Sequence, residues 1–288
     1  MTGASYWSQL DRHTEWDEIW MSHPAVRARI NRRVTGDPFR WPIAWLPSVV
    51  PGRVPFRRAL SIGCGVGNFE RTLVEFGIVE SVTGIDASPE VIAEAKRRAE
   101  GMGGIEYLAA DARQILKTAR GFDAIFFHAS LHHFDRLSEL LGFVRAALEP
   151  RGILYLDEYV GPARDEWTWS DLIRWNLVYR TLPAAIRRTH LIRRPINRED
   201  PTEAIASSDI LRAVAEHFRI ITRRDYGGDL LTVIYPSLLR PGQPNGPSPE
   251  LFEAVLESLL DREERLLARG RDSFQTVVVA EARPTAAG

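Results

Sequence analysis

The chain has 288 residues, of which 44% are hydrophobic and 26% charged, and its formal net charge is −1. This composition is ordinary for a globular protein, and the near-neutral charge argues against a generally basic nucleic-acid binder. The single cysteine, Cys64, excludes an intramolecular disulfide and a cysteine-based metal site. No apolar run approaches the ~20 residues of a membrane span, and no signal peptide is evident. We therefore expect a cytoplasmic protein with no membrane partner.

The first 55 residues are expected to form a helical segment ahead of the main domain. Trp16, Ile19 and Trp20 fall on one helical face, and a second helical run follows from Ala25 to Arg33. Prolines then predict irregular structure up to the main domain, at Pro42, Pro47, Pro51 and Pro55. Two interpretations stay open for residues 1–55: aromatic packing against the main domain, or a lid that excludes water from an active site.

From residue 56 to residue 288, strand-like and helix-like segments alternate. The expected strands are Ala59–Ile62, Ser81–Ile85, Ile105–Ala109, Phe122–His128, Ile153–Tyr159, Arg219–Arg224 and Phe274–Ala280. The expected helices are Asn68–Phe76, Pro89–Glu100, Leu137–Leu148, Ser207–Phe218 and Pro249–Arg269. This alternation predicts an α/β fold with a doubly wound, mainly parallel sheet of seven strands.

Residues 161–205 interrupt the alternation and are interpreted as an inserted helical cap. Trp167, Trp169 and Leu172 suggest a helix, and an Arg-rich run from Arg187 to Arg198 follows it. This run has three open interpretations: a solvated basic surface, a clamp for an acidic acceptor, or a contact for RNA. Residues 240–249, rich in proline and glycine, predict a surface loop.

Three glycines at alternate positions, Gly63, Gly65 and Gly67, directly follow the first expected strand. A strand, a glycine turn and a helix N-terminus together present backbone N–H groups to a polar or anionic ligand. Dinucleotides and S-adenosylmethionine are both bound at such turns. The dinucleotide fingerprint places a glycine where this chain has Asn68, which argues against NAD. Asp86, at the end of the second expected strand, suits two ribose hydroxyls as hydrogen-bond donors.

Successive segments of the chain resemble the motifs of class I S-adenosylmethionine-dependent methyltransferases, in the order of that family. They are Leu60–Gly67, Gly84–Ser88, Ala110–Ala112, Phe122–His133 and Leu148–Leu156. The resemblance covers about residues 56–160 and implies a Rossmann-like fold with S-adenosylmethionine as cofactor. Segments outside it, Trp16–Pro24, Asp157–Pro162 and Glu199–Glu203, resemble a bacterial subgroup described only as methyltransferase-domain proteins.

The resemblance also implies a set of cofactor-binding positions. The three glycines would surround the methionine part of the cofactor, and Asp86 with Ala87 would lie at its ribose. Asp111 and Ala112 would lie near the adenine, although a helix cap is the alternative role for Asp111. His128, at the end of the fourth strand, would line the reacting end.

Methyl transfer from a sulfonium is an in-line displacement, so the protein mainly positions the acceptor and excludes water. An oxygen acceptor of high pKa also needs a general base. The candidates are His132, His133 and Glu158, because they follow or end strands whose carboxyl ends meet at one edge of the sheet. A His–carboxylate pair across these strand ends would orient the imidazole. A metal held by His132, His133, Asp157 and Glu158 was weighed, but no spacing is diagnostic and none is expected.

These features predict an enzyme that methylates a small molecule, by O-methylation of a sugar or secondary-metabolite hydroxyl in a biosynthetic reaction. C- or N-methylation of a small metabolite is the nearest alternative. An RNA or protein methyltransferase and a cofactor-binding protein without catalysis are alternatives of other classes. A nucleic-acid partner is not expected, and a homodimer stays open.

Overall fold

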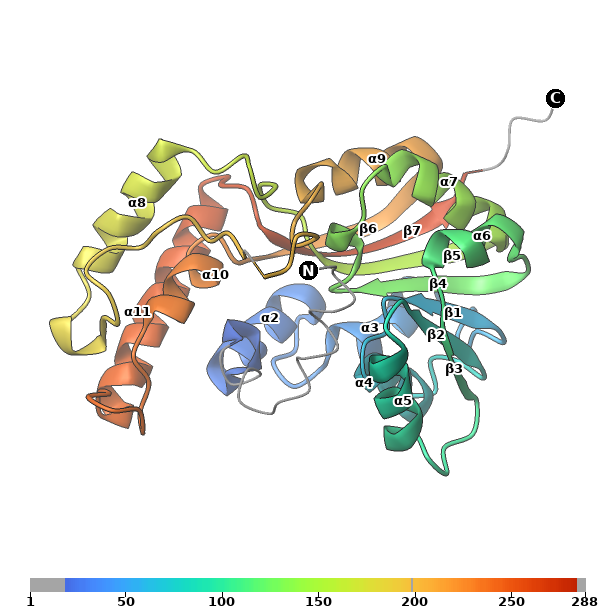
Figure 1. Cartoon of the computed structure of the whole chain (residues 1–288), viewed down its shortest axis with the longest axis horizontal. Coiled ribbons are helices and arrows are strands. Elements are labelled where there is room, and N and C mark those ends of the chain that lie inside the picture. The colour runs from blue at the N-terminus through green and yellow to red at the C-terminus, as the bar shows by residue number, and fades with distance from the viewer. Residues whose placement is uncertain (1–18, 198, 284–288) are drawn as a thin grey trace.

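The computed structural model describes residues 19–197 and 199–283, and it is built around one seven-stranded sheet (Figure 1). The strand order is β3-β2-β1-β4-β5-β7-β6. Strands β1 to β5 pair in parallel, whereas β7 runs antiparallel between β5 and β6. The strands are β1 Ala59–Ile62, β2 Val82–Asp86, β3 Ile105–Ala109, β4 Phe122–His128, β5 Leu148–Tyr159, β6 Phe218–Gly227 and β7 Gln275–Ala282. The predicted doubly wound, mainly parallel α/β sheet is confirmed.

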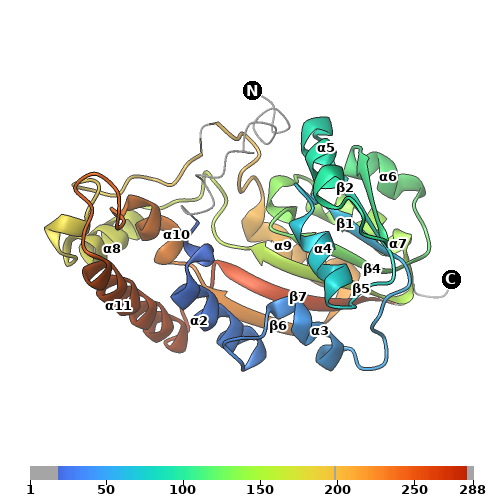
Figure 2. The ribbon, with the colours of Figure 1, turned by 90° about the horizontal axis from the view of Figure 1, so that it is seen from below.

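Helices cover both faces of the sheet (Figures 1 and 2). One face carries α4 (Asn68–Glu75) and α5 (Pro89–Arg98). The other carries α6 (Ala112–Thr118), α7 (Leu137–Ala147) and α9 (Ile210–His217). Helix α5 begins as predicted, because Ser88 accepts a hydrogen bond from Val91 N and Pro89 occupies the first turn. Helix α6 was not predicted, since its seven residues are too few to show a helical period.

The described part of the N-terminal segment packs against the sheet and the last helix. It contains η2 (Trp20–Ser22), α2 (Pro24–Thr35) and α3 (Pro42–Val49). Val26 and Ile30 of α2 are buried, and Arg29 pairs with three acids of α11 (Pro249–Ala268), namely Glu257, Asp261 and Glu264. Trp16 lies outside the described residues, and the interpretation of residues 1–55 as a lid stays a prediction.

The prediction of irregular structure between Pro42 and Pro55 is wrong for α3. Pro42 lies in the first turn of this helix, where a missing N–H costs nothing. Pro47 lies inside the helix, but burial of Ile43 and Leu46 against the core outweighs its local penalty. Tertiary packing therefore decides the structure of this segment.

Two insertions extend the sheet at one end. The first, residues 160–209 between β5 and α9, is called the cap here and contains α8 (Trp169–Arg180). The second, residues 228–274 between β6 and β7, contains α10 (Leu231–Ile234) and α11. Figure 1 shows α8, α10 and α11 grouped together beyond the sheet. No helix among the described residues is long and apolar enough to cross a membrane.

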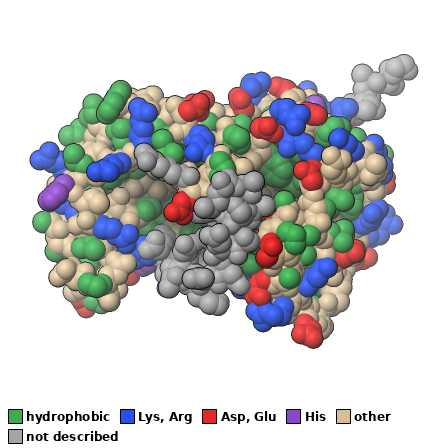
Figure 3. Space-filling model, viewed as in Figure 1, with side chains coloured by type: hydrophobic (Ala, Val, Ile, Leu, Met, Phe, Trp, Pro, Cys, Tyr) green, Lys and Arg blue, Asp and Glu red, His purple; other side chains and the backbone are tan. Residues whose placement is uncertain are grey.

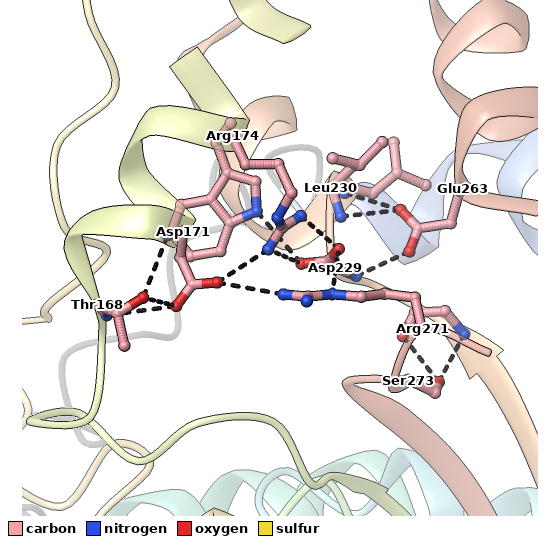
Figure 4. A network of polar contacts seen from close by, with 11 residues as sticks. Thr168, Asp171, Arg174, Asp229, Leu230, Glu263, Arg271 and Ser273 are labelled. Atoms are coloured by element: carbon pink, nitrogen blue, oxygen red, sulfur yellow. Dashed lines mark hydrogen bonds and ion pairs between the residues drawn. The ribbon is translucent and has the colours of Figure 1, made fainter. Parts of the chain in front are cut away.

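A buried carboxylate joins the two insertions (Figure 4). Asp229 is 1% exposed, and its Oδ1 accepts hydrogen bonds from Arg174 Nη2 at 2.9 Å and from Trp175 Nε1 at 3.3 Å. Arg271 Nε lies 3.5 Å from Asp229 Oδ2. The backbone N–H groups of Asp229 and Leu230 donate to Glu263 of α11 at 2.8 and 2.9 Å. Helix α8 is thereby fixed to α11 through polar contacts.

The outer face of α8 is apolar and faces solvent. Trp169 is 73% exposed, Ile173 60% and Leu177 66%. Arg194, from the Arg-rich run, lies over the Trp169 ring at 5.3 Å. Figure 3 shows this end of the molecule with apolar and basic side chains side by side. The three interpretations of the Arg-rich run stay open.

Candidate functional site

The loop after β1 is shaped by its three glycines. Gly63, Gly65 and Gly67 have φ angles of 69°, 53° and 77°, in the left-handed region that favours glycine. A Cβ on Gly67 would lie 2.2 Å from Tyr107 Oη, and one on Gly63 would lie 2.6 Å from Ser130 Cβ. Tyr107 Oη donates to the Gly67 carbonyl at 3.0 Å. The loop is therefore supported by β3 and touches the segment that follows β4.

Asp86 lies at the end of β2, against the glycine loop. Gly65 N donates to its Oδ2 at 3.1 Å, and Ser88 N donates to its Oδ1 at 3.0 Å. Burial raises the pKa of Asp86, and these backbone hydrogen bonds oppose that rise. Each carboxylate oxygen keeps further lone-pair capacity, so the geometry leaves Asp86 able to accept two ribose hydroxyls. Ala87, beside it, is exposed.

Asp111 caps helix α6. Its Oδ1 accepts a hydrogen bond from Gln114 N at 2.9 Å, while Ala112 is buried in the first turn. The capping role that the sequence left open is thus present. The contact of Asp111 and Ala112 with adenine stays a prediction.

His128 ends β4 at the rim of the glycine loop. Its ring is stacked on Phe69, with centroids 4.5 Å apart and planes 12° from parallel. His128 Nε2 lies 4.0 Å from Asp157 Oδ2, and Asp157 Oδ1 accepts a hydrogen bond from Tyr226 Oη at 2.7 Å. His128 is therefore held between α4 and β5, and its contact with the reacting end of the cofactor stays a prediction.

Glu158, on β5, organises the segment after β4. It is 1% exposed, and its Oε1 accepts the N–H groups of Ser130 and Leu131, both at 2.7 Å. Its Oε2 lies 2.8 Å from His132 Nδ1. Ser130 Oγ donates to the Ile62 carbonyl at 2.6 Å, which ties this segment to the end of β1. The His–carboxylate pair expected across the two strand ends is present.

The surroundings of the two histidines push their pKa values apart. Burial alone would lower the pKa of His132, but the hydrogen bond and charge of Glu158 outweigh it and raise that pKa. Burial lowers the pKa of His133 well below its ordinary value, and the neighbouring charge of His132 adds to this. The rings lie 4.2 Å apart between centroids. His132 therefore favours a proton more strongly than His133.

Side chains of the cap complete this group. His133 Nδ1 lies 3.2 Å from Thr202 Oγ1 and 3.5 Å from Asp200 Oδ2. Glu203 faces both rings, with Oε1 3.9 Å from His132 Nε2 and Oε2 3.9 Å from His133 Nε2. The cap backbone is also tied here, because Ile205 N donates to the His132 carbonyl at 3.1 Å. The histidines thus lie where the core and the cap meet.

The sequence did not assign a site role to Tyr107, Asp200 or Glu203. In the sequence, the run Glu199–Glu203 stands out only through its resemblance to a bacterial subgroup, and it lies far from His132 along the chain. The available signal was an acidic run directly after a basic one, which is also common on surfaces.

A family model described as a methyltransferase domain matches residues 60–156. This span runs from β1 to near the end of β5 and includes the glycine loop, Asp86, Asp111 and both histidines. It is a class I S-adenosylmethionine-dependent methyltransferase domain. The family and cofactor implied by the sequence motifs are confirmed for this domain.

Curated relatives of the methyltransferase domain differ in what they methylate. A trans-aconitate 2-methyltransferase of Streptomyces avermitilis is 35% identical over 130 residues, which are 42% of this chain and 44% of that protein. A fatty-acid O-methyltransferase of Mycolicibacterium smegmatis is 26% identical over 204 residues, 70% of this chain and 64% of that protein. The matched part of this chain therefore spans less than half of the trans-aconitate relative.

Among solved structures, this chain is similar to the N-methyltransferase NodS from Bradyrhizobium japonicum WM9, in complex with S-adenosyl-L-homocysteine. The TM-score is 0.49 at 14% identity, over 98% of this chain and 97% of that chain.

Proposed function

We propose that this chain transfers the methyl group of S-adenosylmethionine to an oxygen atom of a small molecule, with a hydroxyl of a sugar or secondary metabolite as the acceptor. The observation that carries this proposal is the position of His132. It is buried, oriented by Glu158, and two residues beyond Ser130, whose side chain touches the glycine loop. A cytoplasmic location is part of the same proposal.

The cofactor supplies an activated methyl group when bound, and residues of this chain form its binding site. The backbone N–H groups of the glycine loop and of the first turn of α4 would bind the carboxylate of its methionine part. Asp86 would accept the ribose hydroxyls. The acceptor enters from the side of the cap, where His132, His133 and Glu203 meet, and the cap excludes water from this space.

Glu158 acts as a positioning residue for His132. Glu158 Oε1 accepts two backbone N–H groups, which holds the side chain in place, and its Oε2 accepts a hydrogen bond from the Nδ1–H of His132. This fixes the tautomer in which Nε2 carries a lone pair. Nε2 faces Glu203, so the lone pair points to the proposed acceptor space.

Replacement of Glu158 by Gln tests this role. The Gln side chain can donate from its amide to Nδ1, which selects the opposite tautomer and removes the lone pair from Nε2. We expect kcat to fall at least ~100-fold while the affinity for S-adenosylmethionine, by calorimetry, stays within about twofold. An unchanged kcat would contradict the role of Glu158.

A carboxylate acceptor is the second candidate, because the two relatives described above are named for trans-aconitate and for fatty acids. The Arg-rich run of the cap offers groups that pair with such an acid. Incubation of metabolite fractions with methyl-labelled cofactor separates the candidates, since a methyl ester is cleaved by mild alkali and a methyl ether is not.

The same incubation also tests the reaction class. We expect the label in a small molecule after filtration. Label found only in RNA or protein, or no label in any fraction, would overturn the proposal in favour of a macromolecular acceptor or of cofactor binding without catalysis.

A further inference from the structure

Three potential metal ligands converge where the core and the cap meet. One ligand atom from each of His132, His133 and Glu203 lies within 4.8 Å of the others. The two Nε2 atoms each face an oxygen of Glu203 at 3.9 Å. This distance is too long for a hydrogen bond. It is close to the ~3.4 Å that separates ligand atoms around a tetrahedral zinc ion, at ~2.1 Å from the metal.

Both imidazoles are oriented as metal ligands are in proteins. A metal-binding histidine usually directs its other ring nitrogen to a carboxylate or carbonyl, which fixes the ring and its tautomer. His132 Nδ1 lies 2.8 Å from Glu158 Oε2, and His133 Nδ1 lies 3.5 Å from Asp200 Oδ2. For His133 the contact runs through a hydroxyl, because Nδ1 lies 3.2 Å from Thr202 Oγ1, which donates to Asp200 Oδ1 at 2.6 Å. Both Nε2 atoms are directed to Glu203.

The charge around this group also fits a cation. Glu158 is 1% exposed and Asp200 fully buried, and Glu203 adds a third, half-buried carboxylate. Asp200 Oδ2 has no hydrogen-bond partner among the described residues, although burial of such an atom is costly. Arg164 donates its hydrogen bonds to the backbone carbonyls of Asp200 and Pro201, although its charge also acts on Glu203. A divalent cation between the imidazoles and Glu203 would compensate these acids.

From this arrangement we infer that His132, His133 and Glu203 bind one divalent transition-metal ion of the zinc class. Two imidazoles and one carboxylate form a ligand set that such ions prefer, and it leaves coordination positions open. Because Glu203 belongs to the cap, the ion also joins the cap to the segment after β4. The sequence suggested no metal, since Glu203 lies far from the histidines along the chain.

The open positions give the ion a role on the acceptor side. The open coordination positions would hold the acceptor oxygen beside the cofactor, whether that oxygen belongs to a hydroxyl or to a carboxylate. With the ion bound, the Nε2 lone pair of His132 would be a ligand, so activation of the acceptor oxygen by the ion would replace proton abstraction by His132. This role rests on the proposed methyl transfer, whereas the binding of the ion does not.

Cobalt(II) is the probe for this site, because its visible absorption reports coordination. The full chain is stripped with a chelator and titrated with Co²⁺ alone, and Zn²⁺ is then added. We expect one equivalent of Co²⁺ to bind with an absorption typical of nitrogen and oxygen ligands, and Zn²⁺ to displace it. Absence of this absorption, together with no Zn²⁺ retained after dialysis, would overturn the inference.

Variants locate the ion. Glu203→Gln and His133→Ala should each weaken Co²⁺ binding at least ~10-fold, and Glu158→Gln by ~10–100-fold through the orientation of His132. Glu199→Gln is the matched control, because Glu199 is an exposed carboxylate of the same cap segment. Equal Co²⁺ affinity of Glu203→Gln and Glu199→Gln would contradict the site.

Calorimetry with S-adenosylmethionine separates loss of the ion from loss of the fold. Glu203→Gln should bind the cofactor like the unchanged chain, since Glu203 belongs to the cap and faces the two histidines. Metal binding by a chain that methylates nothing would overturn the proposed function and support the site. Methyl transfer at full rate after complete removal of metal would overturn the role of the ion on the acceptor side.

Discussion

Two regions of this molecule are held together by different kinds of contact: the glycine loop with Asp86, called the cofactor side because we propose that it binds the cofactor, and the cap with the segments that it meets, called the acceptor side because we propose that the acceptor binds there. On the cofactor side, backbone geometry dominates: the glycines have left-handed φ angles, and Gly65 N binds Asp86 directly. On the acceptor side, side chains far apart in the chain meet, as in the contacts of His133 with Thr202 and of Arg174 with Asp229. The first arrangement depends mainly on backbone groups, whereas the second depends on side-chain contacts between distant segments.

The largest effect is expected from breaking the buried ion pairs of the acceptor side. Asp229→Asn keeps the side-chain volume but removes the charge that faces Arg174 and Arg271. We expect a loss of about 3–5 kcal/mol in the free energy of unfolding, measured in urea, because two guanidinium groups lose their buried partner. The affinity for S-adenosylmethionine should stay within about twofold.

Asp272→Asn is the control for this change, because Asp272 is an exposed carboxylate of the same insertion. Equal stability of the two variants would show that the network in Figure 4 does not hold the cap.

A smaller effect is expected from adding a side-chain atom next to Tyr107, which supports the glycine loop. Gly84 lies in β2, and a Cβ added there would approach Tyr107 Cδ1 to 2.8 Å. Gly84→Ala should therefore cost about 1–3 kcal/mol and weaken cofactor binding, since Tyr107 supports Gly67. In a Tyr107→Ala background the same change should cost at least ~1 kcal/mol less. An identical cost in both backgrounds would contradict this packing.

The smallest effect concerns the pH dependence of stability. Glu70, at the start of α4, is fully buried and bonded to Ser61 Oγ. Burial raises its pKa from 4.5 to about 7. Between these pH values the folded chain holds more protons than the unfolded chain, so the free energy of unfolding falls as pH rises. Glu70→Gln removes this loss, so between pH 4.5 and 6 its free energy of unfolding should rise by about 1–2 kcal/mol relative to that of the unchanged chain.

Glu75→Gln, an exposed site on the same helix, provides the comparison. A stability difference between Glu70→Gln and the unchanged chain that does not vary with pH would rule out ionisation of Glu70 as the cause.

The same contrast explains what the sequence could predict. The strand bounds of β1, β3 and β4, the glycine loop and the start of α5 follow from local patterns. The sequence also predicted a His–carboxylate pair across the ends of β4 and β5, but it did not decide which histidine and which acid would form it. Helix α3 was not predicted because it contains two prolines, and the burial of its apolar side chains outweighs their effect on the backbone. Glu203 was missed because its contacts depend on how the cap folds back onto β4, and an acidic residue in a loop has no distinguishing local signal.

Calorimetry with S-adenosylmethionine tests the cofactor site most directly. The full chain should bind one equivalent, and Asp86→Ala should weaken binding at least ~10-fold, because it removes a charged acceptor of two ribose hydroxyls. Circular dichroism should show that the variant keeps its fold. No binding by the unchanged chain, or equal affinity of the folded Asp86→Ala variant, would contradict the assignment of the glycine loop and Asp86 as the seat of the cofactor.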